Sequence, residues 1–368
     1  MSFKKVFFSY CYALFFLIVF IPSAVYVSDP YSLFHRPWFN KGKMYDNLRI
    51  QNYGLIKYEP FDALILGTSM LQNTSADEAT KKLKDRYANL SFSGAGFYER
   101  FFVSNFAFRT KKIKSVILSL DYNFNKEKRI ENSFYPELYS ENFLSGKIKV
   151  YLTHKALLCA LLRIKCGFIE RNLDRPTTWN GLEPHVRHFG GFDNWLKYWD
   201  GQMKKTFKSL LETQIDYKEE YEKYQTIFDD ELLPLFENNK ETSFFVIIPP
   251  YSAFWWKKRE SELEGMMRPY EYLIRKTKNY PNVRIYWFYD EDYVFDIANY
   301  KDLTHYHEFV NSLQLDAIQN GTHIINESNY KQKFAAFIKK VKAFDLEPYL
   351  EKIRTALAEH EAEEKNGK

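Results

Sequence analysis

Cysteine is scarce in this chain of 368 residues, which contains only three. So small a number excludes a scaffold held together mainly by disulfides. Cys159 and Cys166 lie in a run, residues 157–167, whose apolar pattern predicts a buried helix. On a helix their Cα atoms would lie about 10 Å apart, beyond the limit of about 7 Å for a disulfide. We therefore expect both residues to be core thiols.

A large excess of charge of one sign is also missing, because 52 Lys and Arg residues face 47 Asp and Glu residues. The lysines are scattered rather than clustered in a stripe, so nucleic-acid binding is not expected. Hydrophobic residues make up 45% of the chain and charged residues 27%, which is typical of a globular protein and not of a disordered one. His185 and His188 have no nearby carboxylate or cysteine except Glu183, so the sequence predicts no metal and no cofactor.

Only one hydrophobic run is long enough to cross a membrane. Residues 6–27 contain no charged side chain, and their number is about what a bilayer core requires. A cleaved signal peptide would have a shorter apolar region and small residues at its cleavage site, which Pro22-Ser23-Ala24 matches poorly. Lys4 and Lys5 favour a cytoplasmic N-terminus. The sequence thus predicts an uncleaved single-pass anchor in the inner (plasma) membrane, with the rest of the chain periplasmic or otherwise extracytoplasmic.

Composition and pattern divide the chain into four parts. Residues 1–28 are the anchor, and residues 29–60 form a polar and aromatic juxtamembrane linker. Residues 61–328 alternate strand-like and helical patterns, with a mainly helical insertion at about 125–240. Residues 329–368 form a charged C-terminal helix and tail. Strands that alternate with helices predict an α/β domain with a central parallel sheet. The expected strands are residues 61–66, 88–92, 113–120, 243–248 and 282–288.

Polar residues follow these strands directly. Ser69 follows the first strand, Gly94 the second, Asp121-Tyr122-Asn123 the third and Tyr251 the fourth. Because ligands bind beyond the carboxyl ends of parallel strands, we expect these residues at one edge of the sheet. The sequence thus predicts a single site there.

Ser69 can act as a nucleophile if a base removes its proton in the transition state. His305 is the expected base, and Asp302, three residues earlier, is the carboxylate that would hold the imidazole in the correct tautomer. Each piece also has a simpler interpretation. A serine after a strand is commonly a helix cap, and Asp-x-x-His is commonly a turn before a helix.

An acyl-transfer intermediate also requires donors aimed at the developing oxyanion. The backbone N–H groups of Ser69 and Gly94 and the side chain of Asn123 are the candidates. Tyr122, Tyr251 and Trp255 are candidates for lining a sugar-binding groove, since aromatic rings suit such grooves. The alternative is that the aromatic residues pack the insertion against the sheet.

Four blocks of the sequence resemble the SGNH (GDSL-like) hydrolase superfamily, in particular its membrane-anchored DltD-like and AlgJ/AlgX-like envelope branch. The blocks are residues 64–69 (LILGTS), 89–94 (NLSFSG), 115–122 (SVILSLDY) and 302–306 (DLTHY). The resemblance implies a three-layer α/β/α, flavodoxin-like domain. It also implies a Ser69–His305–Asp302 triad that cleaves or transfers acyl esters on cell-envelope glycans, beside a multi-spanning membrane acyltransferase as a partner.

Two positions depart from the family pattern. The nucleophile block has Gly-Thr-Ser in place of Gly-Asp-Ser, and the Gly-x-Asn-Asp block is replaced by Asp121-Tyr122-Asn123. If Asp121 faces the site, its carboxylate would oppose an oxyanion. Two functions therefore remain open. The first is a serine esterase or O-acyltransferase that acts on an acylated glycan or polysaccharide. The second is a catalytically silent glycan-binding or scaffolding subunit of an envelope assembly complex.

Overall fold

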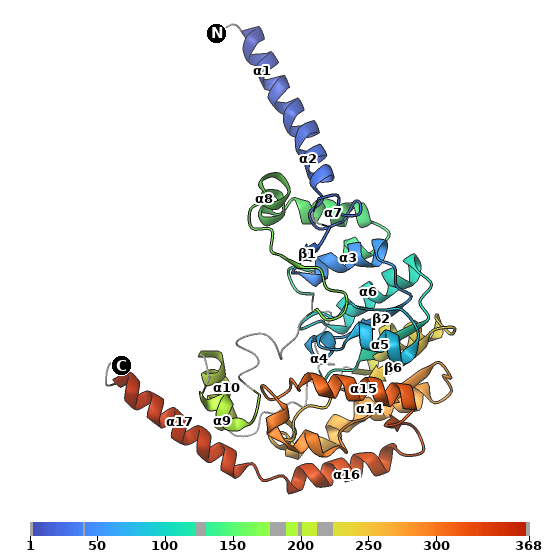
Figure 1. The fold of residues 1–368 in the computed structure, drawn as a ribbon, viewed down its shortest axis with the longest axis vertical. Coiled ribbons are helices and arrows are strands. Elements are labelled where there is room, and N and C mark those ends of the chain that lie inside the picture. Colours follow the sequence, from blue (N-terminus) through green and yellow to red (C-terminus); the bar gives the residue numbers. More distant parts are fainter. Residues whose placement is uncertain are drawn as a thin grey trace. The chain divides into compact units, whose positions relative to one another are not determined.

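The computed structural model describes residues 3–39, 41–122, 130–176, 189–197, 201–211 and 224–365. These residues form two compact units. The first combines residues 1–61 with 98–113 and 130–173, and the second combines residues 62–97 with 114–129 and 174–368. Each unit is thus assembled from segments far apart in the sequence. The elements are drawn in Figure 1.

The second unit is an α/β domain built on a six-stranded sheet with the spatial order β3-β2-β4-β6-β7-β8. The first five of these strands run parallel, and β8 pairs antiparallel with β7. The predicted α/β class with a mostly parallel central sheet is therefore confirmed. The bounds are β2 Ala63–Leu66, β3 Tyr87–Asn89, β4 Ser115–Ser119, β6 Ser243–Ile247, β7 Val283–Tyr286 and β8 Ile324–Ile325.

The strands form because short apolar runs are buried on both faces of the sheet. All four residues of β2 and all five of β4 are buried. Each strand lies inside the range expected from the sequence, except that β3 begins one residue earlier. The sequence did not predict β8, which has only two residues and therefore carries no periodic signal.

Helices of the second unit connect and flank these strands. Ser75 caps α5 by accepting a hydrogen bond from the backbone N–H of Glu78 at 3.0 Å, as its position before Glu78 predicts. The predicted C-terminal helix is interrupted at residues 344–346 and forms two helices. The helices are α4 Ser69–Gln72, α5 Ala76–Leu83, α9 Phe192–Lys197, α10 Gly201–Leu211, α11 Tyr224–Ile227, η4 Phe228–Leu232, α12 Leu233–Glu237, α13 Ala253–Lys257, η5 Glu260–Glu262, α14 Leu263–Thr277, η6 Asp292–Phe295, η7 Ile297–Asn299, α15 Glu308–Asn320, α16 Tyr330–Ala343 and α17 Glu347–Lys365.

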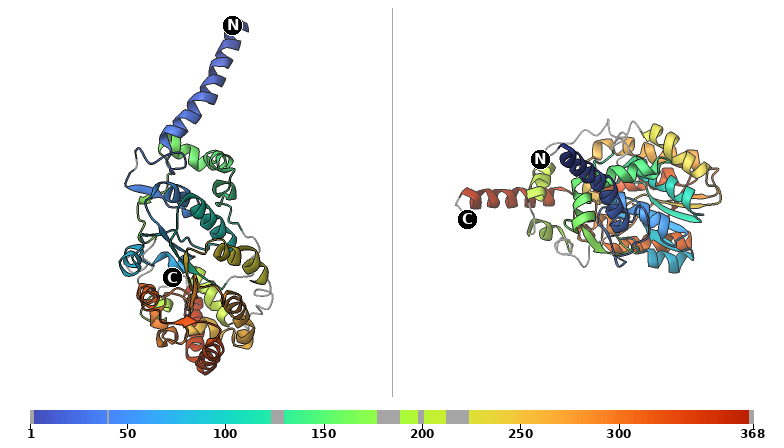
Figure 2. Two further views of the ribbon diagram at one scale, coloured as in Figure 1. Left: turned by 90° about the vertical axis from the view of Figure 1, so that its right-hand side faces the viewer. Right: turned by 90° about the horizontal axis from the view of Figure 1, so that it is seen from above.

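The first unit contains the N-terminal apolar helix. It runs over 26 residues, Phe3–Ser28, and is long and apolar enough to cross a membrane. Figure 2 shows it extending away from the other elements of the first unit along most of its length. The unit also holds most of α6 and a small antiparallel sheet. Its elements are α1 Phe3–Phe15, η1 Phe16–Phe20, α2 Ile21–Ser28, β1 Lys43–Tyr45, α3 Leu48–Tyr58, α6 Phe97–Thr110, η2 Pro136–Tyr139, α7 Phe143–Tyr151, α8 His154–Leu162 and β5 Phe168–Glu170.

Cys159 and Cys166 form a disulfide, with Cα atoms 4.7 Å apart. The expectation of two separate core thiols on one helix was therefore wrong. Helix α8 ends at Leu162, and Arg163 adopts a left-handed conformation with a φ of 59°. The chain turns there and brings Cys166 back to the last turn of the helix. The sequence hides this ending because neither glycine nor proline follows Leu162 directly.

Candidate active site

Ser69 lies at the carboxyl end of β2, where the chain turns from strand to helix. Thr68 caps α4, since its Oγ1 accepts the backbone N–H of Met70 at 3.2 Å. Gly67 is required in this turn, because a Cβ there would lie 2.6 Å from Ser119 Oγ and 2.9 Å from the side chain of Leu71. The turn therefore presents Ser69 as the first residue of α4, with its side chain half-buried.

His305 and Asp302 lie in a loop closed by backbone pairing. Tyr300 and Tyr306 form an isolated antiparallel bridge, and the N–H of Lys301 donates to the carbonyl of His305 at 3.0 Å. Inside this loop, Asp302 Oδ1 accepts the backbone N–H of His305 at 2.9 Å and that of Thr304 at 3.0 Å. The three-residue spacing thus folds the carboxylate back onto its own histidine.

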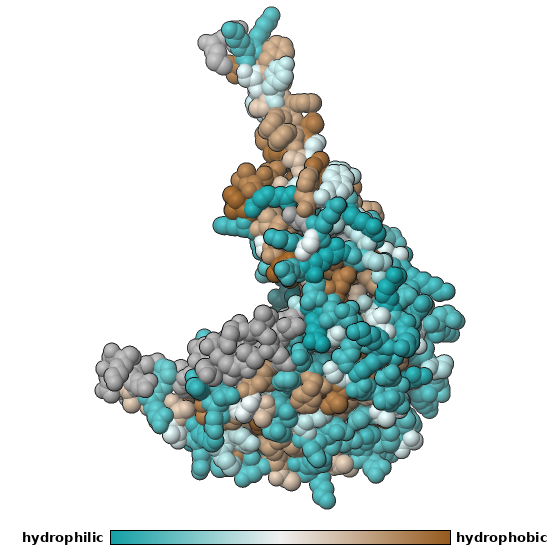
Figure 3. Space-filling model, in the orientation of Figure 1, coloured by the Kyte–Doolittle hydropathy of each residue, from teal (hydrophilic) through white to brown (hydrophobic). Residues whose placement is uncertain are grey.

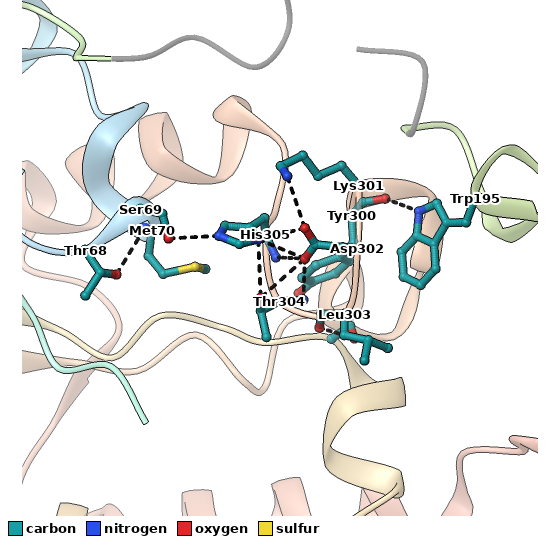
Figure 4. A network of polar contacts seen from close by, with 11 residues as sticks. Thr68, Ser69, Met70, Trp195, Tyr300, Lys301, Asp302, Leu303, Thr304 and His305 are labelled. Carbon is teal, nitrogen blue, oxygen red and sulfur yellow. Dashed lines mark hydrogen bonds and ion pairs between the residues drawn. The ribbon is translucent and has the colours of Figure 1, made fainter. Parts of the chain in front are cut away.

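The structure brings the three predicted catalytic residues together (Figure 4). Ser69 Oγ lies 2.8 Å from His305 Nε2, although 236 positions separate the two residues. His305 Nδ1 lies 2.9 Å and 2.8 Å from the two oxygens of Asp302. A carboxylate can only accept, so Nδ1 carries the proton and Nε2 is free to accept from the serine hydroxyl. This is the hydrogen-bond order that a serine nucleophile requires.

The carboxylate of Asp302 is held ionised. Burial would raise its pKa, but the charge and hydrogen bonds of His305, together with the charge of Lys301, lower the pKa well below its usual range. Lys301 Nζ lies 3.1 Å from Asp302 Oδ2. The side chains of His305 and Asp302 are 25% and 26% exposed, so the dyad remains open to solvent. An ionised Asp302 can stabilise the imidazolium that forms when His305 takes a proton.

Two buried side chains, Tyr306 of the loop that holds His305 and Asn311 of α15, hold helix α4 in place. Tyr306 OH donates to the carbonyl of Met70 at 3.1 Å, and Asn311 Nδ2 donates to the same carbonyl at 3.0 Å. Asn311 Nδ2 also lies 2.9 Å from Thr74 Oγ1. Burial raises the pKa of Tyr306, so its hydroxyl stays protonated and can donate. These contacts fix Ser69 opposite His305, and Asn311 is a positioning residue that the sequence did not identify.

The base of the histidine loop is anchored from two other elements. Trp195 Nε1 donates to the carbonyl of Tyr300 at 2.9 Å, as Figure 4 shows. The carbonyl of Leu303 accepts from the backbone N–H and the Oγ of Ser252, at 3.2 Å and 2.6 Å. Ser252 follows β6, so the loop is fixed to the same sheet edge from which Ser69 projects.

Asp121 lies beside the nucleophile turn rather than in solvent. It is 2% exposed, and its two oxygens accept from Thr68 Oγ1 at 2.6 Å and Ser119 Oγ at 2.5 Å. Ser119 Oγ also accepts the N–H of Thr68 at 3.3 Å. The carboxylate therefore binds the hydroxyls that shape the turn next to Ser69.

Of the three predicted oxyanion donors, the structure describes two. Asn123 lies outside the described residues. In the part of the chain that the structure describes, the backbone N–H groups of Ser69 and Gly94 donate to no acceptor. Gly94 is exposed in a turn and has a φ of 63°, a conformation that favours glycine. Two N–H groups thus remain available at the residues predicted to supply them.

The three predicted substrate-binding aromatic residues lie in one cluster after β4 and β6. The Tyr122 ring packs edge-on to the Trp255 ring at 5.5 Å between centroids, and Tyr251 packs on Trp255 at 5.0 Å. Tyr122 and Tyr251 are each 8% exposed, and the backbone N–H of Tyr122 donates to Tyr251 OH at 3.2 Å. Trp255 is half-buried, with the Arg259 guanidinium 3.7 Å from the centre of its ring. Only Trp255 therefore offers much surface to a ligand.

Among the described residues, no three His, Cys, Asp or Glu side chains gather as metal ligands. His185 and His188 lie outside the described part of the chain. His307 caps α15, since its Nδ1 accepts the N–H of Phe309 at 3.3 Å. Its imidazole is thus occupied at the helix start.

Comparison of the sequence with protein-family models gave no match, and comparison with curated proteins gave none either. What can be concluded about the site therefore comes from its own geometry.

Proposed function

We propose that this protein is a membrane-anchored serine esterase or O-acyltransferase that uses Ser69, His305 and Asp302 on acyl esters of a cell-envelope polysaccharide or glycan. The observation that carries the proposal is the unbroken hydrogen-bond chain from Ser69 Oγ through His305 to Asp302, with contacts of 2.8 Å on both sides of the imidazole. Structural serines and Asp-x-x-His turns have no reason to meet in this order.

The geometry supports a two-step acyl transfer. Ser69 Oγ attacks the acyl carbonyl while His305 Nε2 takes its proton, and the N–H groups of Ser69 and Gly94 stabilise the oxyanion. Collapse of this intermediate expels the alcohol, which takes the proton from His305, and leaves an acyl-serine. A second hydroxyl then gives its proton to His305 and attacks the acyl-serine, and collapse of this second intermediate breaks the bond to Ser69 Oγ, which takes the proton back from His305. Water in this step gives hydrolysis, whereas a sugar hydroxyl gives transfer.

We propose a flavodoxin-like, three-layer domain of the SGNH type as the scaffold. The five parallel strands support this, because numbered along the chain they lie in the order 2-1-3-4-5, the order of flavodoxin-like sheets. Ser69 follows the first of these strands and Asp121 the third. These two strands flank the topological switch point, where ligands of such sheets bind.

The proposed location is outside the cytoplasm, at the inner membrane. The N-terminal helix, with Lys4 and Lys5 before its apolar part, supports a single span with a cytoplasmic N-terminus. The Cys159–Cys166 disulfide supports the same location, because disulfides persist in oxidising compartments. An acyl donor on the cytoplasmic side would then require a multi-spanning membrane acyltransferase as a partner.

One observation favours a second candidate, a silent glycan-binding or scaffolding subunit. The buried Asp121 carboxylate belongs to the segment that replaces the Gly-x-Asn-Asp block, and a negative charge near the site disfavours an oxyanion. Its two hydroxyl partners, on Thr68 and Ser119, offset that charge. We therefore rank the enzyme first.

Reaction of the full-length protein in detergent with a fluorophosphonate probe tests the proposal, with p-nitrophenyl acetate hydrolysis as a second assay. Labelling should occur in the wild type and disappear in Ser69→Ala and His305→Ala. Ser93→Ala is the matched control, since Ser93 also follows a strand at the same edge and its Oγ donates to Gln72 Oε1 at 2.7 Å. A folded wild-type protein that neither labels nor hydrolyses would favour the silent subunit.

A further inference from the structure

The two helices α7 and α8 form a hairpin that exposes apolar side chains to an unusual degree. Leu152 is 69% exposed, Leu162 60% and Leu144 57%. Leu144 and Ile148 of α7 and its C-cap residue Leu152 are spaced by four residues and therefore lie on one side of the helix. Leu161 and Leu162 at the end of α8 and Ile164 just after it are also exposed. An exposed apolar surface of this kind marks an interaction site.

The same segment is basic. Residues 143–165 contain no Asp or Glu, but they include Lys147, Lys149, Lys155, Arg163 and Lys165. Lys147 is buried, and the other four are exposed. Lys149 is paired with Glu137. Helices with an apolar face and cations at its border are typical of elements that lie in the membrane interface.

The hairpin is continuous with the N-terminal helix. Helix α8 packs against α2, and α7 packs against α8, all within the first unit. Figure 3 shows hydrophobic side chains over α8, directly beside the lower end of the N-terminal helix. If that helix spans a bilayer, its end at Ser28 lies at the bilayer surface, and so does whatever packs on it.

We propose that the α7–α8 hairpin is a second membrane contact, which lies in the leaflet where the N-terminal helix emerges and prefers anionic lipid headgroups. Leu144, Ile148, Leu152, Leu161, Leu162 and Ile164 enter the acyl boundary, while Lys155, Arg163 and Lys165 meet phosphates. Trp38 and Phe39, 51% and 60% exposed, add aromatic side chains at headgroup depth. This inference does not depend on the proposed catalytic activity.

The disulfide has a defined place in this surface. It joins the buried Cys159 of α8 to Cys166, after a turn in which Arg163 and Lys165 have positive φ angles of 59° and 56°. Such angles are disfavoured for residues other than glycine. The cross-link keeps this turn closed, which fixes Ile164 and the two cations at the exposed end of the hairpin.

A lipid bilayer suits the surface better than a protein groove does. The apolar residues are distributed over two helices. The charged side chains of residues 143–165 are all basic, and no acidic residue among them would select a basic partner. A bilayer that contains anionic lipid offers both an apolar layer and negative charge over the whole area. An experiment can therefore distinguish a lipid contact of this surface from a protein contact.

The test uses full-length protein with Cys11→Ser, reconstituted in nanodiscs of phosphatidylcholine alone or with phosphatidylglycerol. A nitrobenzoxadiazole label is attached at Leu152→Cys or Leu162→Cys, and at Lys112→Cys, an exposed polar position of the same unit, as the control. At positions 152 and 162 the emission should shift to the blue, rise several-fold and be quenched by spin-labelled lipids. The Lys112→Cys label should keep its water-like emission.

The lipid preference is tested in the same samples. The signal at position 162 should be stronger with phosphatidylglycerol, and Lys155→Gln with Lys165→Gln should remove that difference. An unchanged thermal unfolding midpoint shows that the variants fold. Water-like emission at both positions in both lipids would overturn the proposal. So would a blue shift that lipid quenchers do not reach and that requires a co-reconstituted multi-spanning protein, because the surface would then be a protein contact.

Discussion

In the unit built on the six-stranded sheet, the strands bury their apolar residues, and polar side chains meet where the strands end. In the other unit, the α7–α8 hairpin buries Lys147 and exposes leucines. Apolar side chains are exposed at a cost unless a ligand or a membrane covers them. The comparison therefore separates a unit that gathers polar side chains at a sheet edge, where we propose chemistry, from a unit that exposes apolar side chains, where we propose a lipid contact, and each can be perturbed alone.

The largest expected effect comes from Asp302→Asn. The amide would leave the hydrogen-bond order around His305 wrong, and we expect the rate of Ser69 acylation to fall roughly 10⁴-fold, as for the equivalent change in serine-protease triads. Stopped-flow burst kinetics with p-nitrophenyl acetate would measure it. The environment of a label on the α7–α8 hairpin should not change. A loss below tenfold would show that Asp302 does not orient the imidazole during catalysis.

The next largest effect should perturb the first unit and leave the catalytic residues of the second unit unchanged. Replacement of both Cys159 and Cys166 by serine opens a short loop and should destabilise the first unit by roughly 2–3 kcal/mol. Urea unfolding followed by limited proteolysis of the hairpin would report it. Fluorophosphonate labelling of Ser69 should be retained, because the disulfide and the catalytic residues belong to different units. If the variant lost both the fluorophosphonate labelling and the stability of the hairpin, the two units would be strongly coupled.

A smaller effect is expected from Asp121→Asn. An amide offers one acceptor oxygen where the carboxylate offers two, so the hydroxyl of Thr68 or Ser119 would lose its partner. We expect a loss of roughly 1–3 kcal/mol in stability and slower acylation, because the turn that presents Ser69 loosens. Thermal unfolding measures the loss of stability, and burst kinetics measure the acylation rate. Faster acylation in a less stable protein would show instead that the negative charge of Asp121 opposes the oxyanion.

The smallest effect is the pH dependence that Asp302 gives to stability. Its pKa is lowered in the folded protein, so its stabilising contribution is present above the unfolded-state pKa of about 3.9 and is lost as pH falls through the folded value. The difference in urea midpoint between the wild type and Asp302→Asn should thus be constant from neutral pH to about pH 5 and shrink below about pH 4. A difference that already declines near pH 6 would contradict a lowered pKa.

Much of the second unit could be predicted from the sequence because its signals are local. Short apolar runs that end in glycine, proline or polar residues gave the five parallel strands, and the Ser75–Glu78 pair gave the start of α5. Parallel strands present their carboxyl ends at one edge, so Ser69 and the residues after β4 were expected to be neighbours. Asp302 and His305 are three residues apart, which made their contact a local prediction as well.

Other features carry no local signal. Helix α3 forms in the segment expected to be a juxtamembrane linker and is largely buried, although its pattern is polar and aromatic. The disulfide depends on the end of α8, which no glycine or proline directly after Leu162 marks in the sequence. The role of Asn311 depends on Met70, which is 241 positions away. Such contacts follow from packing between distant segments and not from the period of the hydrophobic pattern.

By itself, the sequence determined the single long apolar run, the alternation of strands and helices, and the order of the serine, aspartate and histidine along the chain. Only the tertiary structure decided that Ser69 meets His305, that Asp121 binds the Thr68 hydroxyl, and that the α7–α8 hairpin faces outward. The physical reason is that hydrophobic periodicity fixes which face of an element is buried. The contact between Ser69 and His305 instead depends on packing that brings together residues 236 positions apart.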